Sequence, residues 1–224
     1  MLSLKSLDSI FSVLNQKTTY LVLRNYEGFY DSVLLDNHAD IDILCDIKDK
    51  KKLIDLLVAE PRFDKNDGIH YRFQVSSGWI PIDIRSVGDG YYDLNWEKNM
   101  LKNRELDSRG FYHMSSEDYF WSLLYHALYH KGNISDEYYD RLAQLKPHLF
   151  PASKEQLMEQ LDVYMRTNEY YYTIAKDKYL WYHFSDLCNG RIKAYPFYKA
   201  KKFAAKCREY AYRTILRRKV NANK

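Results

Sequence analysis

Two short segments in which isoleucine alternates with charged residues limit most strongly what this chain can fold into. Residues 40–46 read DIDILCD, and residues 79–85 read WIPIDIR. Successive side chains of a β-strand point to opposite faces, so this alternation predicts two half-buried strands. We therefore expect a sheet in which the isoleucines enter the core and the aspartates share the opposite face.

The segments around these two strands predict the rest of an α+β region. Apolar residues at helical spacing predict a helix over 4–14 and another over 49–60, which Pro61 ends. β-forming residues predict a strand over 18–24, and a Ser-Ser-Gly turn joins a predicted hairpin of strands 69–75 and 79–87.

Helix signals replace the strand signals after about residue 93. Ser115, Ser135 and Ser153 stand where N-cap residues are expected, and Ser153 forms a capping box with Gln156. We predict an α+β fold class, with a small mixed β-sheet core followed by an all-helical C-terminal region. The predicted divisions are an α+β domain at 1–110, a helical domain at 111–190 and a basic C-terminal helix at 191–224.

The composition is that of a folded globular protein, with 46% hydrophobic and 29% charged residues. No apolar run approaches the length of a membrane span, and residues 1–15 lack the continuous apolar stretch of a secretory signal. Cys45, Cys188 and Cys207 are odd in number and irregular in spacing, which favours a reducing compartment. We expect a cytoplasmic protein.

The net charge of +4 conceals two opposed parts. Residues 191–224 hold twelve Lys or Arg and one acid, so residues 1–190 carry a net charge of −7. A basic amphipathic helix binds an anionic membrane surface, an acidic partner, or the acidic body of its own chain. Binding to an anionic membrane surface and binding to the acidic body of the same chain both stay open as predictions. In the first case the protein would be peripheral on the inner membrane surface. No nucleic-acid motif accompanies the charge, so nucleic acid is not expected as a partner.

Asp40, Asp42 and Asp83 are the residues most suggestive of chemistry. Asp40 and Asp42 project from one face of a strand, and Asp83 joins them if the two strands are neighbours. Adjacent carboxylates repel one another unless a cation lies between them, and Mg²⁺ prefers such oxygen ligands. Carboxylate-held metal ions stabilise the oxygens in displacement at phosphorus. The alternative is a solvated strand end with no function.

These carboxylates also carry a family resemblance. The DIDILCD and IPIDI strands, with the elements between them, resemble the nucleotidyltransferase-fold superfamily over residues 18–93. The strings YLVLRNYEG, PIDIRSVGDGYYD and EDYFWSLLYHALYHKG look like nucleotidyltransferase-like proteins encoded among bacterial surface-polysaccharide genes. Transferases of the LicD and fukutin types are more distant members of the fold.

The resemblance implies a transferase that moves a nucleotidyl or phosphosugar-type group from an activated donor to a glycan-related acceptor. Asp40, Asp42 and Asp83 match the catalytic and metal-binding carboxylates of the family, with Mg²⁺ or Mn²⁺ as the cofactor. The residues that we expect to contact phosphate or substrate are Arg24, Asn25, Arg85, His126, His130 and Lys131.

The chain departs from the family before the first aspartate strand. Typical members have a Gly-Ser pair there to hold the nucleotide phosphates, whereas this chain reads LRNYEG, with Gly28 available for a turn. Two alternatives follow. One is a non-catalytic binding or scaffold protein of a polysaccharide assembly, and the other is a nucleotidyl-transferring toxin.

The segment 117–131 predicts a helix that is apolar nearly all round and therefore buried. His126 and His130 are four residues apart, which makes them neighbours on the helix and matches the spacing of a zinc pair. No third ligand accompanies them. Interior histidines, and contact of His126, His130 or Lys131 with phosphate or sugar, are the stronger alternatives.

Overall fold

The computed structural model describes residues 6–24, 26, 40–62, 68–76 and 78–173. Asn25, Gly28 and the basic segment 191–224 lie outside the described residues, as do Cys188 and Cys207. In the described part of the chain, no helix combines the length and the apolar character needed to cross a membrane.

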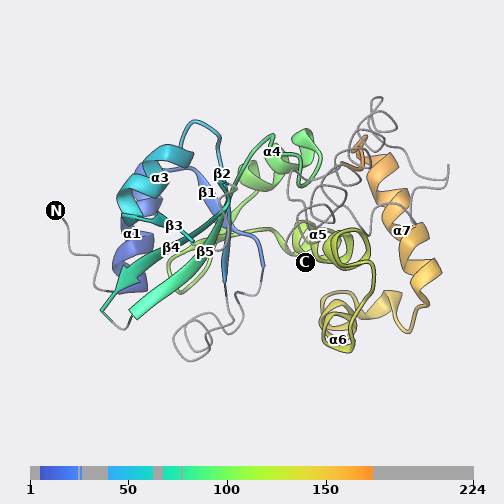
Figure 1. Cartoon of the computed structure of the whole chain (residues 1–224). Coiled ribbons are helices and arrows are strands. Elements are labelled where there is room, and N and C mark those ends of the chain that lie inside the picture. Colours follow the sequence, from blue (N-terminus) through green and yellow to red (C-terminus); the bar gives the residue numbers. More distant parts are fainter. Residues whose placement is uncertain (1–5, 25, 27–39, 63–67, 77, 174–224) are drawn as a thin grey trace, which may run out of the picture.

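The predicted α+β class is confirmed, because a seven-stranded mixed sheet is followed by a helical region (Figure 1). The strand order is β3-β4-β5-β2-β1-β7-β6. The strands are β1 (Tyr20–Val22), β2 (Ile41–Cys45), β3 (Glu60–Pro61), β4 (His70–Val75), β5 (Gly78–Ser86), β6 (Glu105–Leu106) and β7 (Tyr112–His113). The β2/β5 and β1/β7 pairs are parallel, and the other pairs are antiparallel.

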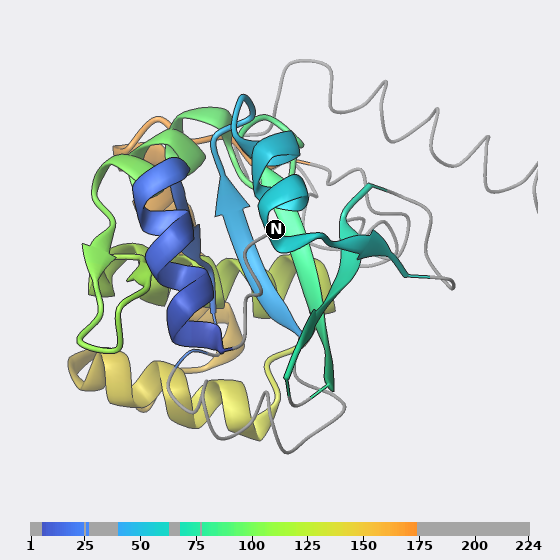
Figure 2. The same cartoon turned by 90° about the vertical axis from the view of Figure 1, so that its left-hand side faces the viewer.

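Helices cover both faces of this sheet. The helices and helical turns are α1 (Leu7–Lys17), α3 (Lys50–Leu57), α4 (Leu94–Lys102), α5 (Ser116–Tyr125), η1 (His126–Lys131), α6 (Asp136–Leu145), η2 (Pro147–Leu149) and α7 (Lys154–Thr167). Helices α1 and α3 lie on one face, in front of the strands in Figure 2, and α5 lies beyond the other face. The central strands are therefore enclosed in protein.

The predicted helix starts are confirmed. The hydroxyls of Ser115, Ser135 and Ser153 each accept a hydrogen bond from a backbone N–H in the first turn of α5, α6 and α7, respectively. Ser153 and Gln156 form the predicted capping box. These caps satisfy backbone donors that have no partner inside the helix.

Two expectations about strands were wrong. Strands β6 and β7 follow residue 93, and β7 pairs with β1, which extends the sheet on that side. Strand β2 is not half-buried, because all five of its residues are buried. The division of the chain into domains stays a prediction.

The predicted helix over 117–131 changes its winding partway. It is an α-helix to Tyr125, and then forms a π-helical turn from His126 to Lys131. Its burial is as predicted, since residues 118–130 are all buried. Turns of this type occur often at functional sites.

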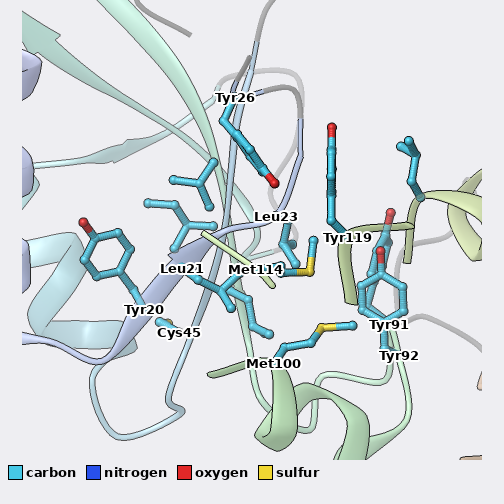
Figure 3. Close-up of a cluster of buried hydrophobic side chains, with 14 of the residues drawn as sticks. Tyr20, Leu21, Leu23, Tyr26, Cys45, Tyr91, Tyr92, Met100, Met114 and Tyr119 are labelled. Carbon is cyan, nitrogen blue, oxygen red and sulfur yellow. The ribbon is translucent and has the colours of Figure 1, made fainter. Parts of the chain in front are cut away.

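One continuous hydrophobic core joins the sheet to the helical region. Figure 3 shows side chains from β1 and β2 on one side of this cluster and from α4 and α5 on the other, among them Tyr20, Cys45, Met100 and Tyr119. Tyr91 and Tyr92, from the turn after β5, lie at the edge of the same cluster. This turn therefore lies where the sheet meets the helices.

Candidate active site

Three polar residues form a row across three neighbouring strands. Asp42 of β2 is the register partner of Asp83 of β5, and Asp83 is the partner of His70 of β4. Register partners point to the same face of a sheet, so all three side chains face the helical region. The predicted approach of the two aspartate strands is confirmed.

Asp83 lies in the middle of this row, and its carboxyl group holds a proton more tightly than an ordinary aspartate does. Burial, together with the charges of Asp42 and Asp40, raises its pKa to about 7. His70 Nε2 lies 3.4 Å from Asp83 Oδ2, whereas Oδ1 is buried and has no hydrogen-bond partner among the described residues. An acceptor of this kind fits a ligand that brings positive charge.

Asp40 lies just before β2 and is more exposed than the other two aspartates. Arg62 Nη1 lies 3.4 Å from its Oδ1. Among the described residues, no group of three or more His, Cys, Asp or Glu side chains is arranged to hold a metal ion. Mg²⁺ is commonly held by one or two carboxylates together with substrate phosphates, so the Asp42 and Asp83 pair, with its unpartnered oxygen, fits this ion.

Arg24, which follows β1, forms a buried ion pair with Asp42. Its Nη2 donates to Asp42 Oδ1 at 2.8 Å, and the two side chains are 10% and 8% exposed. Burial lowers the pKa of Arg24, but Asp42 and the neighbouring tyrosines more than offset this, so the pKa lies well above its ordinary value. Arg24 is thus a fixed positive charge beside the carboxylates.

Tyr91 connects Arg24 to the helical region. Arg24 Nη1 donates to the Tyr91 hydroxyl at 3.0 Å, and this hydroxyl lies 2.7 Å from His126 Nδ1. The Tyr91 ring also packs against Arg85, whose Cζ lies 3.6 Å from the ring centroid. One tyrosine therefore contacts two arginines. Arg85 also forms an ion pair with Asp89, in which Arg85 Nη1 lies 3.5 Å from Asp89 Oδ2.

His126 and His130 both belong to this buried network. Their Nδ1 atoms are 3.2 Å apart. Burial and the nearby arginine charges hold the pKa of each histidine well below its ordinary value, so both are neutral near pH 7. The structure gives this pair no third His, Cys, Asp or Glu ligand among the described residues. Lys131 is exposed at the end of η1, outside the buried network.

Glu97 supports the turn that carries Tyr91. Its two carboxylate oxygens accept hydrogen bonds from the backbone N–H groups of Gly88 at 2.7 Å and of Tyr92 at 3.1 Å. Burial, together with the charge of Asp89, raises the pKa of Glu97 to about 8. Asp93 is the N-cap of α4 and accepts from two backbone N–H groups at the start of that helix.

His70 and Tyr91 belong to this site but were not predicted from the sequence. In the structure Val75 pairs with Gly78, which puts His70 opposite Asp83, whereas the predicted turn would pair Val75 with Trp79 and put Tyr71 there. Tyr91 follows the Gly-Asp-Gly turn after the predicted strand, but nothing in the local sequence distinguishes it from Tyr92. Of the predicted residues, Asp42, Asp83, Arg24, Arg85, His126 and His130 come together, whereas Asn25 lies outside the described residues.

The chain matches no protein-family model and no curated protein. A similar solved structure is that of the antibiotic-resistance factor ANT(2'')-Ia, which is 12% identical to this chain with a TM-score of 0.39. The match covers 71% of this chain and 89% of that one.

Proposed function

We propose that this chain is a metal-dependent transferase of the nucleotidyltransferase type. It moves a nucleotidyl or phosphosugar-type group onto a glycan-related acceptor in surface-polysaccharide assembly. The observation that supports this best is that Asp42 and Asp83 are side by side on parallel strands, with one buried carboxylate oxygen unpartnered. The sequence resemblance supplies the reaction class.

Each residue of the site has a role in this proposal. Asp42 and Asp83 bind Mg²⁺ or Mn²⁺, with Asp40 as a further carboxylate nearby. The metal, when bound, stabilises negative charge on the oxygens around the transferred phosphorus. Asp83 also accepts the proton of the acceptor hydroxyl. Arg24 and Arg85 balance phosphate charge.

The histidines act through Arg24 in this proposal. His126 is buried and contacts Arg24 and Tyr91, so it orients the guanidinium and does not touch substrate. His130 supports His126 from the next turn of the chain. Replacing His126 by Ala then reduces turnover, and a change in folding alone would favour a purely structural histidine.

The test is the Asp42→Asn variant of the full chain. Donors are first found with a thermal-shift panel of nucleotides and sugar nucleotides, with and without magnesium, because bound ligands raise apparent stability. Asp42→Asn is expected to bind less metal and lose nearly all transfer activity. Asp46→Asn is the matched control at the far end of the same strand, where its carboxylate accepts from the Lys48 backbone N–H. Retained turnover in Asp42→Asn would refute the proposal.

A non-catalytic binding protein is the second candidate. The Arg24 and Asp42 ion pair favours it, because the arginine already neutralises one of the two carboxylates. The missing Gly-Ser pair favours it as well. Calorimetry with magnesium and each nucleoside triphosphate discriminates, since a scaffold shows neither metal-dependent nucleotide binding nor turnover.

A further inference from the structure

The proposed reaction would bring a divalent cation and a negatively charged phosphate group into the site, and Arg24 lies where both would bind. Its Nη2 is held by Asp42, and its Nη1 is held by the Tyr91 hydroxyl. A divalent cation that binds Asp42 competes with Arg24 for the carboxylate. A phosphate group that binds Arg24 competes with Asp42 for the guanidinium. The same ion pair therefore opposes the binding of each ligand alone.

The hydrogen-bond directions around Tyr91 fix Arg24 in this position. An arginine only donates, so the Tyr91 oxygen accepts from Nη1. Burial raises the pKa of Tyr91 to about 12, so its hydroxyl keeps its proton and donates it to His126 Nδ1. His126 Nδ1 then carries no proton, in agreement with the low pKa of this histidine. Arg24 Nη1, the Tyr91 hydroxyl and His126 Nδ1 thus form a chain in which each donor faces the next acceptor while Arg24 stays on Asp42.

Burial makes this ion pair different from its neighbour. Arg62 and Asp40 are 3.4 Å apart, with side chains 29% and 31% exposed, so water replaces either partner easily. Arg24 and Asp42 are enclosed, and breaking a buried pair leaves an uncompensated charge on each side. A ligand that takes one partner alone therefore leaves the other partner without compensation, whereas two ligands of opposite charge satisfy both.

We propose that Arg24 is a resident counter-ion that couples divalent-cation binding at Asp42 to the binding of a phosphate group at its own guanidinium. Tyr91 is its positioning residue. The inference rests on the proposed function, in which Asp42 holds metal. Such coupling is reciprocal, so phosphate strengthens magnesium binding by the factor by which magnesium strengthens phosphate binding.

The first experiment uses the unaltered full chain. Magnesium affinity is measured by calorimetry with and without inorganic phosphate, with chloride replacing phosphate at matched ionic strength. Phosphate is expected to tighten magnesium binding within the usual range for coupled sites, about 5- to 150-fold. Equal affinity with phosphate and with chloride would overturn the inference.

Variants then test whether Arg24 carries the coupling. Arg24→Gln is expected to bind magnesium alone more tightly than the unaltered chain and to show no effect of phosphate. Arg166→Gln removes the same charge from an exposed arginine that pairs with Asp162 on α7, and it is expected to keep the full coupling. Coupling that survives Arg24→Gln would overturn the inference.

A milder pair of variants covers the case in which Arg24→Gln does not fold. Tyr91→Phe removes the hydroxyl that accepts from Arg24 and keeps the ring, so we expect tighter binding of magnesium alone and weaker coupling. Tyr92→Phe is the matched control, since the Tyr92 hydroxyl lies 3.4 Å from the Ser122 carbonyl oxygen instead. Identical coupling in the two variants would contradict the role of Tyr91.

The failure of this inference differs from the failure of the proposed function. Magnesium binding without any effect of phosphate overturns the counter-ion role of Arg24 and leaves the proposed transferase intact. No magnesium binding by the unaltered chain, with or without phosphate, overturns both.

Discussion

The two faces of the central sheet are both buried, yet they differ in that Asp42 and Asp83 bring charged groups to one of them. On the face toward α1 and α3, Ile41, Ile43 and Phe11 pack in an apolar layer and are at most 2% exposed. On the other face, Asp42 and Asp83 lie under the helical region. Apolar burial stabilises a fold, whereas buried charge costs free energy unless it is well paired. The first face therefore stabilises the fold at little cost, whereas the second carries buried charge, which the proposed function would use for binding.

The largest expected loss of stability comes from a substitution on the apolar face. Phe11→Ala removes a ring that packs beside Tyr20 and Phe111. The free energy of unfolding should fall by about 3–5 kcal/mol, as for other buried aromatic side chains. Urea denaturation measures the loss, and magnesium affinity of the folded variant serves as the control. A loss well under 1 kcal/mol would show that this face is loosely packed.

The polar face should make stability depend on pH. The pKa of Glu97 is about 8 in the folded chain, against 4.5 for an ordinary Glu, so the folded state holds this proton more tightly than the unfolded state. Stability is therefore highest below about pH 4.5 for this group and is lost as pH rises toward 8, at about 1.4 kcal/mol per pKa unit.

Denaturation at a series of pH values measures this slope, with Glu97→Gln as the comparison. The variant should show a smaller slope, although not a flat one, because the raised pKa of Asp83 acts in the same direction. The same slope in both proteins would mean that Glu97 is ionised in the folded chain throughout this range.

Replacing the buried ion pair by apolar side chains sharpens the comparison further. In the double variant Arg24→Met and Asp42→Leu, we expect stability equal to that of the unaltered chain or greater by up to about 4 kcal/mol. The same variant should lose magnesium binding. Thermal and urea denaturation measure the stability, and calorimetry measures the magnesium binding. A strongly destabilised double variant would show that the pair is kept for the fold.

The smallest expected effect comes from trimming the apolar face. Ile43→Val removes one methylene group next to Asp42 in the sequence, but on the opposite face of β2. The expected cost is about 0.5–1.5 kcal/mol of stability, with the magnesium affinity and its response to phosphate unchanged. A change in that response would show that the two faces are not independent.

The sequence was sufficient to predict the parts of this molecule that depend on local patterns. Alternation identified β2 and β5 and directed Asp42 and Asp83 to one face, and the serines identified three helix starts. Strands β6 and β7 were missed because two residues are too short to show a period of two.

The covering of the polar face could not be predicted in the same way. This face is buried by α5 and η1, which are far away in the sequence. A half-buried strand and a fully enclosed strand can show the same alternation of apolar and polar residues, so the alternation did not reveal the burial. The π-helical turn at His126–Lys131 has no Gly or Pro to announce it. The ion pair of Arg24 with Asp42 depends on a short non-regular segment after β1, whose side-chain directions follow no periodicity.

The parallel pairing of β2 with β5 also has a consequence for how the chain folds. The β4/β5 hairpin joins residues close in sequence, whereas Asp42 and Asp83 meet only after α3 and that whole hairpin have closed a long loop. We expect the hairpin to form early and the two carboxylates to meet late. In kinetic terms, Ile43→Val should then change mainly the unfolding rate, whereas Ile80→Val in the hairpin should slow folding. The proposed metal site would thus be among the last parts of the native state to form and the first to open.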